Sequence, residues 1–241
     1  MPPTGINRGH GPLATDEAGR MSNADSPVLV IAAGHVLTVD RKDRVLRDHA
    51  VVVRDRKIAA IVPVEEAARR WPRAERLDLP DHVLMPGLVN AHTHLAMNLL
   101  RGLADDLPLK AWLEDHVWPA EARWVGDEFV LDGSLLAIAE MIRGGITCFA
   151  DNYFFPNATA RAAAQAGIRA MLHPPVMEFA TAWAANADDY IHKALALHDD
   201  YKNHPLVSVG IGPHAPYTVS DAALRRIIML TNELSVPMPV Q

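Results

Sequence analysis

Cysteine is scarce in this sequence of 241 residues, because Cys148 is the only one. A single cysteine cannot form an internal disulfide, which excludes the disulfide scaffolds of small secreted proteins. Long apolar runs are also missing. No stretch reaches the roughly 18 residues that a membrane-spanning helix needs, and the N-terminus lacks the compact apolar core of a signal peptide. These absences predict a cytoplasmic protein.

Clustered positive charge is missing as well. The formal net charge is -6, the isoelectric point is about 6.0, and no run of lysine or arginine occurs. Nucleic-acid binding needs a basic surface, so we expect no nucleic-acid partner and no membrane partner. A dinucleotide-binding loop is not present either, because Gly210-Ile211-Gly212 lacks the third glycine of that fingerprint. We expect a small-molecule substrate, and association into a homo-oligomer stays open.

Apolar residues are abundant. With 49% hydrophobic and 22% charged residues, the chain has the composition of a globular protein with one large domain or two modest ones. Residues 1–26 differ, because they mix Pro, Gly, Asn, Asp and Ser without an apolar period, and this predicts a disordered tail. Met21 lies just before the first strand-like run and is an alternative translation start.

Residues 27–86 have the texture of a small β domain. Short β-branched runs are separated by charged turns such as Asp40-Arg41-Lys42-Asp43. The pattern predicts a small β-sandwich domain that is incomplete without strands from the C-terminal part of the protein. The expected strands are Val28–Ala32, His35–Val39, Ala50–Val53, Lys57–Ile61 and Arg76–Met85, and the expected helix is Pro63–Trp71.

From Gly87 onward, apolar strands alternate with helices. Right-handed strand-helix-strand units build a parallel sheet, and strand ends flanked by loops suit a (β/α)₈ barrel. The expected fold class is therefore α/β, with the N-terminal half of such a barrel over residues 87–241, comprising strands one to four and the start of strand five. The expected strands are Leu88–His92, Thr147–Asp151, Arg169–Leu172, Val207–Gly212 and Val236–Gln241, and the helices are Asp127–Arg143, Thr159–Ala166, Asp188–Tyr201 and Asp221–Leu234.

His92 and His94 are the clearest candidates for chemistry. They lie two residues apart at the end of a predicted strand, so both side chains point to the same face. In a barrel that face is the interior at the C-terminal rim, where active sites lie. Two imidazoles that converge there can bind one metal cation.

Five motifs together resemble a known family. The run Met85 to His94, MPGLVNAHTH, is similar to the first-strand signature of the amidohydrolase superfamily. Four further runs narrow the resemblance to the 5-methylthioadenosine/S-adenosylhomocysteine deaminases and their triazine-hydrolase relatives, and the similarity extends from about residue 28 to the last residue. These runs are residues 101–113 (RGLADDLPLKAWL), 118–121 (WPAE), 144–151 (GGITCFAD) and 212–217 (GPHAPY).

The resemblance implies one divalent metal, zinc in the first place, with His92 and His94 as two of its ligands. The metal would activate a water for hydrolytic removal of ammonia from C6 of an adenine nucleoside. In the family, a third histidine, a proton-carrying glutamate, a further histidine and an aspartate follow later in the chain. No catalytic residue can therefore be assigned within this sequence, which ends at the expected start of strand five, and we expect the 241-residue chain to be inactive by itself.

Two more residues are implied in substrate binding. Glu121, in the loop after the first barrel strand, matches the glutamate that holds the ribose hydroxyls. His214, at the end of strand four, matches a histidine that contacts the base. His173 ends strand three and could face the same pocket. Because no arginine lies between Leu172 and Val176 to bind an amino-acid carboxylate, the sequence favours methylthioadenosine or adenosine over S-adenosylhomocysteine.

Other functions and other roles stay open. Within the superfamily, a guanine, 8-oxoguanine or triazine aminohydrolase would share the histidine pair without needing Glu121. In another class, the chain would be a non-catalytic truncated paralogue or a gene-model fragment, and the exposed edges of a half barrel predict poor solubility. We expect Trp112, Trp118 and Phe154-Phe155 to pack in the core, with an apolar cover over a thioether or adenine as the alternative. We expect Cys148 to be a buried, inert thiol.

Overall fold

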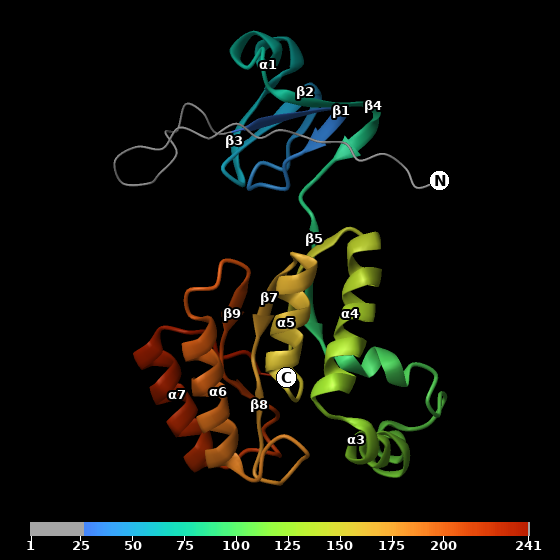
Figure 1. Ribbon diagram of the computed structural model, residues 1–241, viewed down its shortest axis with the longest axis vertical. Helices are drawn as coiled ribbons and strands as arrows, with labels where there is room; N and C mark the ends of the chain where they lie inside the picture. Colours follow the sequence, from blue (N-terminus) through green and yellow to red (C-terminus); the bar gives the residue numbers. More distant parts are fainter. Residues whose placement is uncertain (1–26, 241) are drawn as a thin grey trace, which may run out of the picture. The chain divides into compact units, whose positions relative to one another are not determined.

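The computed structural model describes residues 27–240. Residues 1–26, predicted to be a disordered tail, and the alternative start at Met21 lie outside the described part of the chain. The fold divides into two compact units, Met1–Pro86 and Gly87–Gln241, which Figure 1 shows. Each unit is described by itself.

The first unit is a four-stranded sheet with one helix. The strand order is β3-β2-β1-β4, with β4 parallel to β1 and the other pairs antiparallel. Helix α1 contacts β2 and β3. The elements are β1 (Val28–Leu37), β2 (Val45–Arg54), β3 (Lys57–Pro63), α1 (Val64–Arg70) and β4 (Glu75–Leu84).

Both faces of this sheet carry buried apolar side chains. One cluster contains Val30 and Val52 together with Ala67 of α1, and a separate cluster contains Val36 and Val51. Because side chains alternate along a strand, these clusters lie on opposite faces. A sheet that is apolar on both faces fits one layer of a sandwich, and the second layer stays a prediction.

The first strand of this unit differs from the prediction made from the sequence. Two strands were predicted on either side of Gly34, whereas β1 is one continuous strand with an irregularity between Ala33 and His35. A Cβ atom at Gly34 would lie 2.0 Å from the Pro80 carbonyl oxygen. Gly34 is therefore a point of close backbone approach inside a strand, and interpreting it as a break was wrong.

The second unit is built on a parallel sheet of order β5-β6-β7-β9, beside a two-stranded pair β10-β8. Figure 1 shows helices alternating with these strands. This confirms the predicted α/β class. The strands are β5 (Leu88–Thr93), β6 (Ile146–Asp151), β7 (Arg169–Leu172), β8 (Pro175–Val176), β9 (Val207–Val209) and β10 (Gly212–Pro213), and the main helices are α4 (Asp127–Arg143), α5 (Pro156–Ala166), α6 (Ala187–Tyr201) and α7 (Asp221–Leu234).

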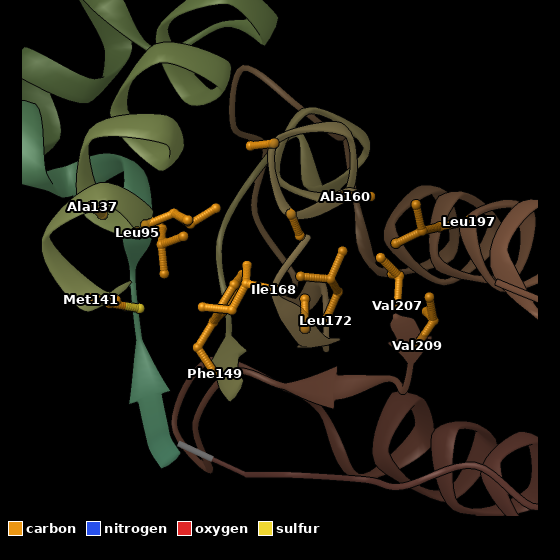
Figure 2. Packing of buried hydrophobic residues seen from close by; sticks show 14 residues of the cluster. Leu95, Ala137, Met141, Phe149, Ala160, Ile168, Leu172, Leu197, Val207 and Val209 are labelled. Carbon is orange, nitrogen blue, oxygen red and sulfur yellow. The ribbon is translucent and has the colours of Figure 1, made fainter. Parts of the chain in front are cut away.

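The core of this unit lies between the sheet and its helices (Figure 2). Phe149 of β6 and Leu172 of β7 are fully buried, and they belong to one cluster with Ile138 of α4 and Leu197 of α6. Burial of each such side chain contributes roughly 1.5–3 kcal/mol of hydrophobic free energy. The packing fixes where each strand ends, and those ends carry the candidate site.

A long helical connection joins β5 to α4. It contains the 3₁₀ helix η1 (Leu95–Leu100), the short helix α2 (Leu109–Ala111), the π-helical turn η2 (Trp112–Val117) and helix α3 (Trp118–Trp124). Glu121, predicted to lie in a loop, is therefore in a helix. Pro119 of α3 directly follows the π-helical turn inside one continuous helical run, and its nitrogen carries no proton to donate to the preceding turn.

Two strand predictions near the end of the chain need correction. The expected strand Val207–Gly212 is interrupted, because β9 ends at Val209 and β10 begins at Gly212. Residues 236–240 form no strand, although the Ile211 amide donates to the Pro237 carbonyl oxygen at 3.2 Å. The segment therefore lies beside the end of β9 without forming a ladder. Within residues 27–240, no helix is long and apolar enough to cross a membrane.

Candidate metal and substrate site

The two predicted metal ligands lie together at the carboxyl end of β5. His92 is the penultimate residue of that strand, and His94 directly follows the strand, at the N-cap position of η1 but without a side-chain capping bond. Their ring centroids are 5.0 Å apart and the ring planes are nearly perpendicular, at 84°. His92 is exposed and His94 is half-buried.

A backbone carbonyl fixes the His94 ring. Its Nδ1 atom lies 2.6 Å from the Asn152 carbonyl oxygen, just beyond the end of β6. A carbonyl oxygen can only accept, so Nδ1 carries the proton, and the lone pair of this tautomer is at Nε2. Burial lowers the pKa of His94, the bond to Asn152 raises it, and the nearby His92 lowers it again. The neutral ring that binds metals is therefore favoured.

The geometry of the pair fits two ligands of one cation. Zinc-nitrogen bonds are about 2.0–2.1 Å and an imidazole centre lies ~1 Å behind its nitrogen, so two tetrahedral ligands have centroids roughly 5 Å apart. Within residues 27–240, however, no group of three or more His, Cys, Asp or Glu side chains is arranged to hold a metal ion. This part of the chain supplies a pair and not a complete shell.

Glu121 is brought toward the histidine pair by Tyr153. The Tyr153 hydroxyl donates to Glu121 Oε1 at 2.6 Å, and the Tyr153 ring centroid lies 6.1 Å from that of His94. Burial raises the pKa of Glu121, while the bond from Tyr153 lowers it. Burial and the Glu121 charge raise the pKa of Tyr153, so its hydroxyl remains a donor.

The histidine pair also affects the pKa values of two further histidines, His173 and His214. Burial lowers the pKa of His173 to about 4, helped by the charges of His92 and His94. Burial, together with His94, also lowers the pKa of His214. The His214 Nδ1 atom lies 3.0 Å from Thr218 Oγ1, which fixes the ring. His214 is half-buried, as a residue lining an open site would be.

The end of β6 contains the residues whose importance sequence reasoning underestimated. Tyr153 was not singled out, although it connects the predicted sugar ligand to the predicted metal ligand. Asp151 and Asn152 were not singled out either, and the structure makes both of them buried hydrogen-bond partners. Their signal in the sequence was their position directly after a buried strand, where site residues of barrels lie.

Not every packing expectation holds. Trp118 is 49% exposed, so the prediction that it packs in the core is wrong. Trp112 is half-buried and donates its Nε1–H to the Leu103 carbonyl oxygen at 3.0 Å. Phe154 and Phe155 do pack against a buried cluster. Cys148 is only partly buried, because its side chain lies on the face of β6 away from the helices.

The sequence of this chain matches a known protein family. The sequence profile of the amidohydrolase family matches residues 83–240. The chain belongs to this family. The match begins just before β5 and covers the whole described part of the second unit, which confirms the resemblance inferred from the motifs.

Relatives in the amidohydrolase family narrow the likeness. The 5-methylthioadenosine/S-adenosylhomocysteine deaminase of Saccharophagus degradans is 49% identical over 91% of this chain and 49% of its own length. That of Teredinibacter turnerae is 50% identical over 89% and 48%. The chain thus spans about half the length of the curated relatives it matches.

Solved structures of amidohydrolase enzymes are also similar to this chain. An adenosine deaminase from Xanthomonas campestris, crystallised with zinc, superposes with a TM-score of 0.86 at 48% identity, over 88% of this chain and 48% of that one. An atrazine chlorohydrolase from Arthrobacter aurescens, also crystallised with zinc, has a TM-score of 0.80 at 22% identity, over 88% and 52%. The latter likeness shows the fold alone. The second unit therefore has the fold of the N-terminal half of an amidohydrolase barrel.

Proposed function

We propose that this chain provides the first half of the active site of a metal-dependent aminohydrolase that acts on an adenine nucleoside. His92 and His94 are two ligands of one divalent metal, for which zinc is the best candidate. The substrate is 5-methylthioadenosine, adenosine or S-adenosylhomocysteine, and the products are the inosine analogue and ammonia.

The observation that carries this proposal is the histidine pair with its fixed ring. The centroid separation suits two ligands of one cation, and the Asn152 carbonyl oxygen selects the tautomer in which the lone pair of His94 is at Nε2. When bound, such a metal supplies an activated water for attack on the amine-bearing carbon. The zinc in the similar adenosine deaminase structure supports the choice of metal.

Glu121 and His214 are proposed to bind the substrate. The Tyr153 hydroxyl occupies one oxygen of the Glu121 carboxylate, which orients the other oxygen for a ribose hydroxyl. His214 is held by Thr218 and would present its ring to the base. The deaminase names of the relatives, and their identities near 50%, favour an adenine nucleoside over guanine or a triazine.

We propose that deamination belongs to a complete barrel and that the described residues are inactive by themselves. They include the metal-directed pair, but no third ligand is grouped with it among residues 27–240. We also propose a cytoplasmic location, which the single cysteine supports, because it allows no internal disulfide. Activity measurements on a completed barrel distinguish this proposal from the alternative of a non-catalytic chain.

The test is to complete the barrel. Residues 1–241 are joined to the C-terminal half of the Saccharophagus degradans relative, and ammonia release is measured with methylthioadenosine, adenosine, S-adenosylhomocysteine, guanine and a triazine. We expect activity on an adenine nucleoside, a loss of at least ~100-fold in kcat/KM for His94→Ala, and no change for His192→Ala, which removes an exposed histidine of α6.

A specific result would contradict the proposal. If the completed barrel released ammonia from guanine or the triazine but not from any adenine nucleoside, the substrate class would be wrong. If the barrel folded, bound zinc and deaminated none of the five compounds, the non-catalytic alternative would hold for this chain.

A further inference from the structure

Asp151 has no evident reason to be a carboxylate. It is the last residue of β6 and only 2% exposed. Among residues 27–240, no lysine, arginine or histidine forms an ion pair with it. A buried carboxylate without a cation costs several kcal/mol, so an apolar residue would be the more stable choice for packing alone.

One hydrogen bond of Asp151 reaches the metal-directed segment. Its Oδ1 atom accepts from the Leu95 amide at 2.7 Å. Leu95 is the first residue of η1, and the His94 side chain makes no capping bond to that helix. The Leu95 amide has no partner within its own helix, so Asp151 satisfies it from a different strand.

The other side of the carboxylate is held by two helices. The side chain of Thr159 in α5 hydrogen-bonds to Asp151, and Ser134 Oγ in α4 lies 3.3 Å from Thr159 Oγ1. Either hydroxyl can be the donor in this second contact. Ser134 and Thr159 are both fully buried. This buried polar chain joins α4, α5 and β6 to the start of η1.

Asp151 and Asn152 together make three hydrogen bonds to the segment around His94. The Asn152 amide donates to the Thr93 carbonyl oxygen at 3.0 Å, the Asn152 carbonyl oxygen binds His94 Nδ1 at 2.6 Å, and Asp151 binds the Leu95 amide. Two consecutive residues of one strand end thus hold three consecutive residues of another. Such partners tune metal affinity by orienting the ligand ring.

We propose that Asp151 is a positioning residue for the metal centre, and that it fixes the backbone on the C-terminal side of His94 through the buried chain Ser134-Thr159-Asp151-Leu95. The inference rests on the proposed role of His94 as a metal ligand. It assigns to Asp151 no contact with metal or substrate. It predicts that the acceptor oxygen, and not the negative charge, is what the site requires.

The test uses the full chain at submicromolar concentration, below the range in which we expect self-association, and two readouts. Amide hydrogen exchange with residue-level mass spectrometry reports on Leu95. The zinc concentration that protects His92 and His94 from carbethoxylation reports on metal affinity, and the exposed His192 serves as the internal control. The variants are Asp151→Ala, Asp151→Asn, which keeps an acceptor oxygen, and Thr159→Val, which keeps the shape of the side chain.

We expect Asp151→Ala to speed exchange at Leu95 selectively and to raise the protecting zinc concentration at least ~10-fold. Asp151→Asn should stay within about 3-fold of the wild type, and Thr159→Val should lie between them. Thr231→Ala removes a buried hydroxyl that bonds only within α7. It should lower stability without changing either readout.

Two results would overturn the proposal: an Asn variant as defective as the Ala variant, or an Ala variant with unchanged Leu95 exchange and unchanged zinc protection. If Asp151→Ala does not fold, Thr159→Val decides, since a folded Thr159→Val chain with no change at Leu95 contradicts the buried chain. If zinc protects no histidine even in the wild type, the metal pair itself fails, and the exchange data still decide the role of Asp151.

Discussion

At the scale of single residues, Tyr153 affects the pKa of Glu121. Its hydroxyl bond lowers the pKa of that carboxyl against the effect of burial. Tyr153→Phe should therefore raise the pKa of Glu121 further and lower the free energy of unfolding by about 1–3 kcal/mol. Carbon-13 NMR titration of the Glu121 carboxyl measures the shift. Tyr217→Phe is the matched control, since Tyr217 is 87% exposed, and an unchanged Glu121 pKa would contradict the account.

His173 makes stability depend on pH in a defined window. Burial lowers its pKa from 6.5 to about 4 in the folded chain. Between those values the unfolded chain binds more protons, so the folded state loses stability as the pH falls from about 6.5 to about 4. Relative to His173→Gln, the wild type should lose up to about 3 kcal/mol across this window. Urea unfolding at several pH values, with chelator present, measures the difference.

Asp151 should have the opposite effect on stability as the pH falls. The comparison of the wild type with His173→Gln removes this contribution. Burial raises its pKa to about 7, so its contribution to stability increases as the pH falls from about 7 to about 4. Both proteins contain Asp151, and its contribution cancels in their difference. A difference that stays constant from pH 7 to pH 4 would mean that His173 is not held neutral by burial.

At the scale of elements, the chain was predictable where a single period dominates. Helices α4 and α7 begin and end at the predicted residues, and β7 matches Arg169–Leu172, because regular periodicity, caps and glycine breaks agree there. Between Leu95 and Trp124 the residues follow no clear period. The structure uses 3₁₀, π and α turns in succession, and their hydrogen bonds depend on contacts that are distant in sequence.

The candidate site was predictable to a similar degree. The histidine pair followed from two-residue spacing on a strand, and Glu121 and His214 followed from motif resemblance. The partners of these residues could not be predicted, because Asn152 lies 58 positions from His94 and Tyr153 lies 32 from Glu121. Such pairs depend on strand register, and register is decided by the packing of the whole sheet.

Gly212 shows how tightly these strand ends fit. A Cβ atom there would lie 2.8 Å from Asn152 Nδ2 and 2.9 Å from the His173 carbonyl oxygen. Gly212→Ala should lower the free energy of unfolding by about 1–3 kcal/mol through overpacking. Gly126→Ala is the control, because nothing lies within 4 Å of a Cβ atom at that position. Chemical denaturation measures both, and equal stabilities of the two variants would contradict the close fit.

At the scale of the whole molecule, the second unit exposes strand edges. In the described residues β5 pairs only with β6, and its Leu88 and Val89 are 50% and 64% exposed. Unpaired edges with apolar side chains promote association. We expect the purified chain to self-associate at micromolar concentration, and Val89→Lys to reduce this. Sedimentation velocity measures it, and a monodisperse monomer with a cooperative melt would show that the edges are protected.

The central claim is that His92 and His94 are two ligands of one metal in an amidohydrolase barrel. The metal content of the completed barrel, measured by mass spectrometry of the purified protein, tests it most directly. The account predicts about one zinc per chain in the wild type, and little or none in the His92→Ala/His94→Ala double variant, with His192→Ala unchanged. A double variant that folds and retains its full zinc content would contradict the account.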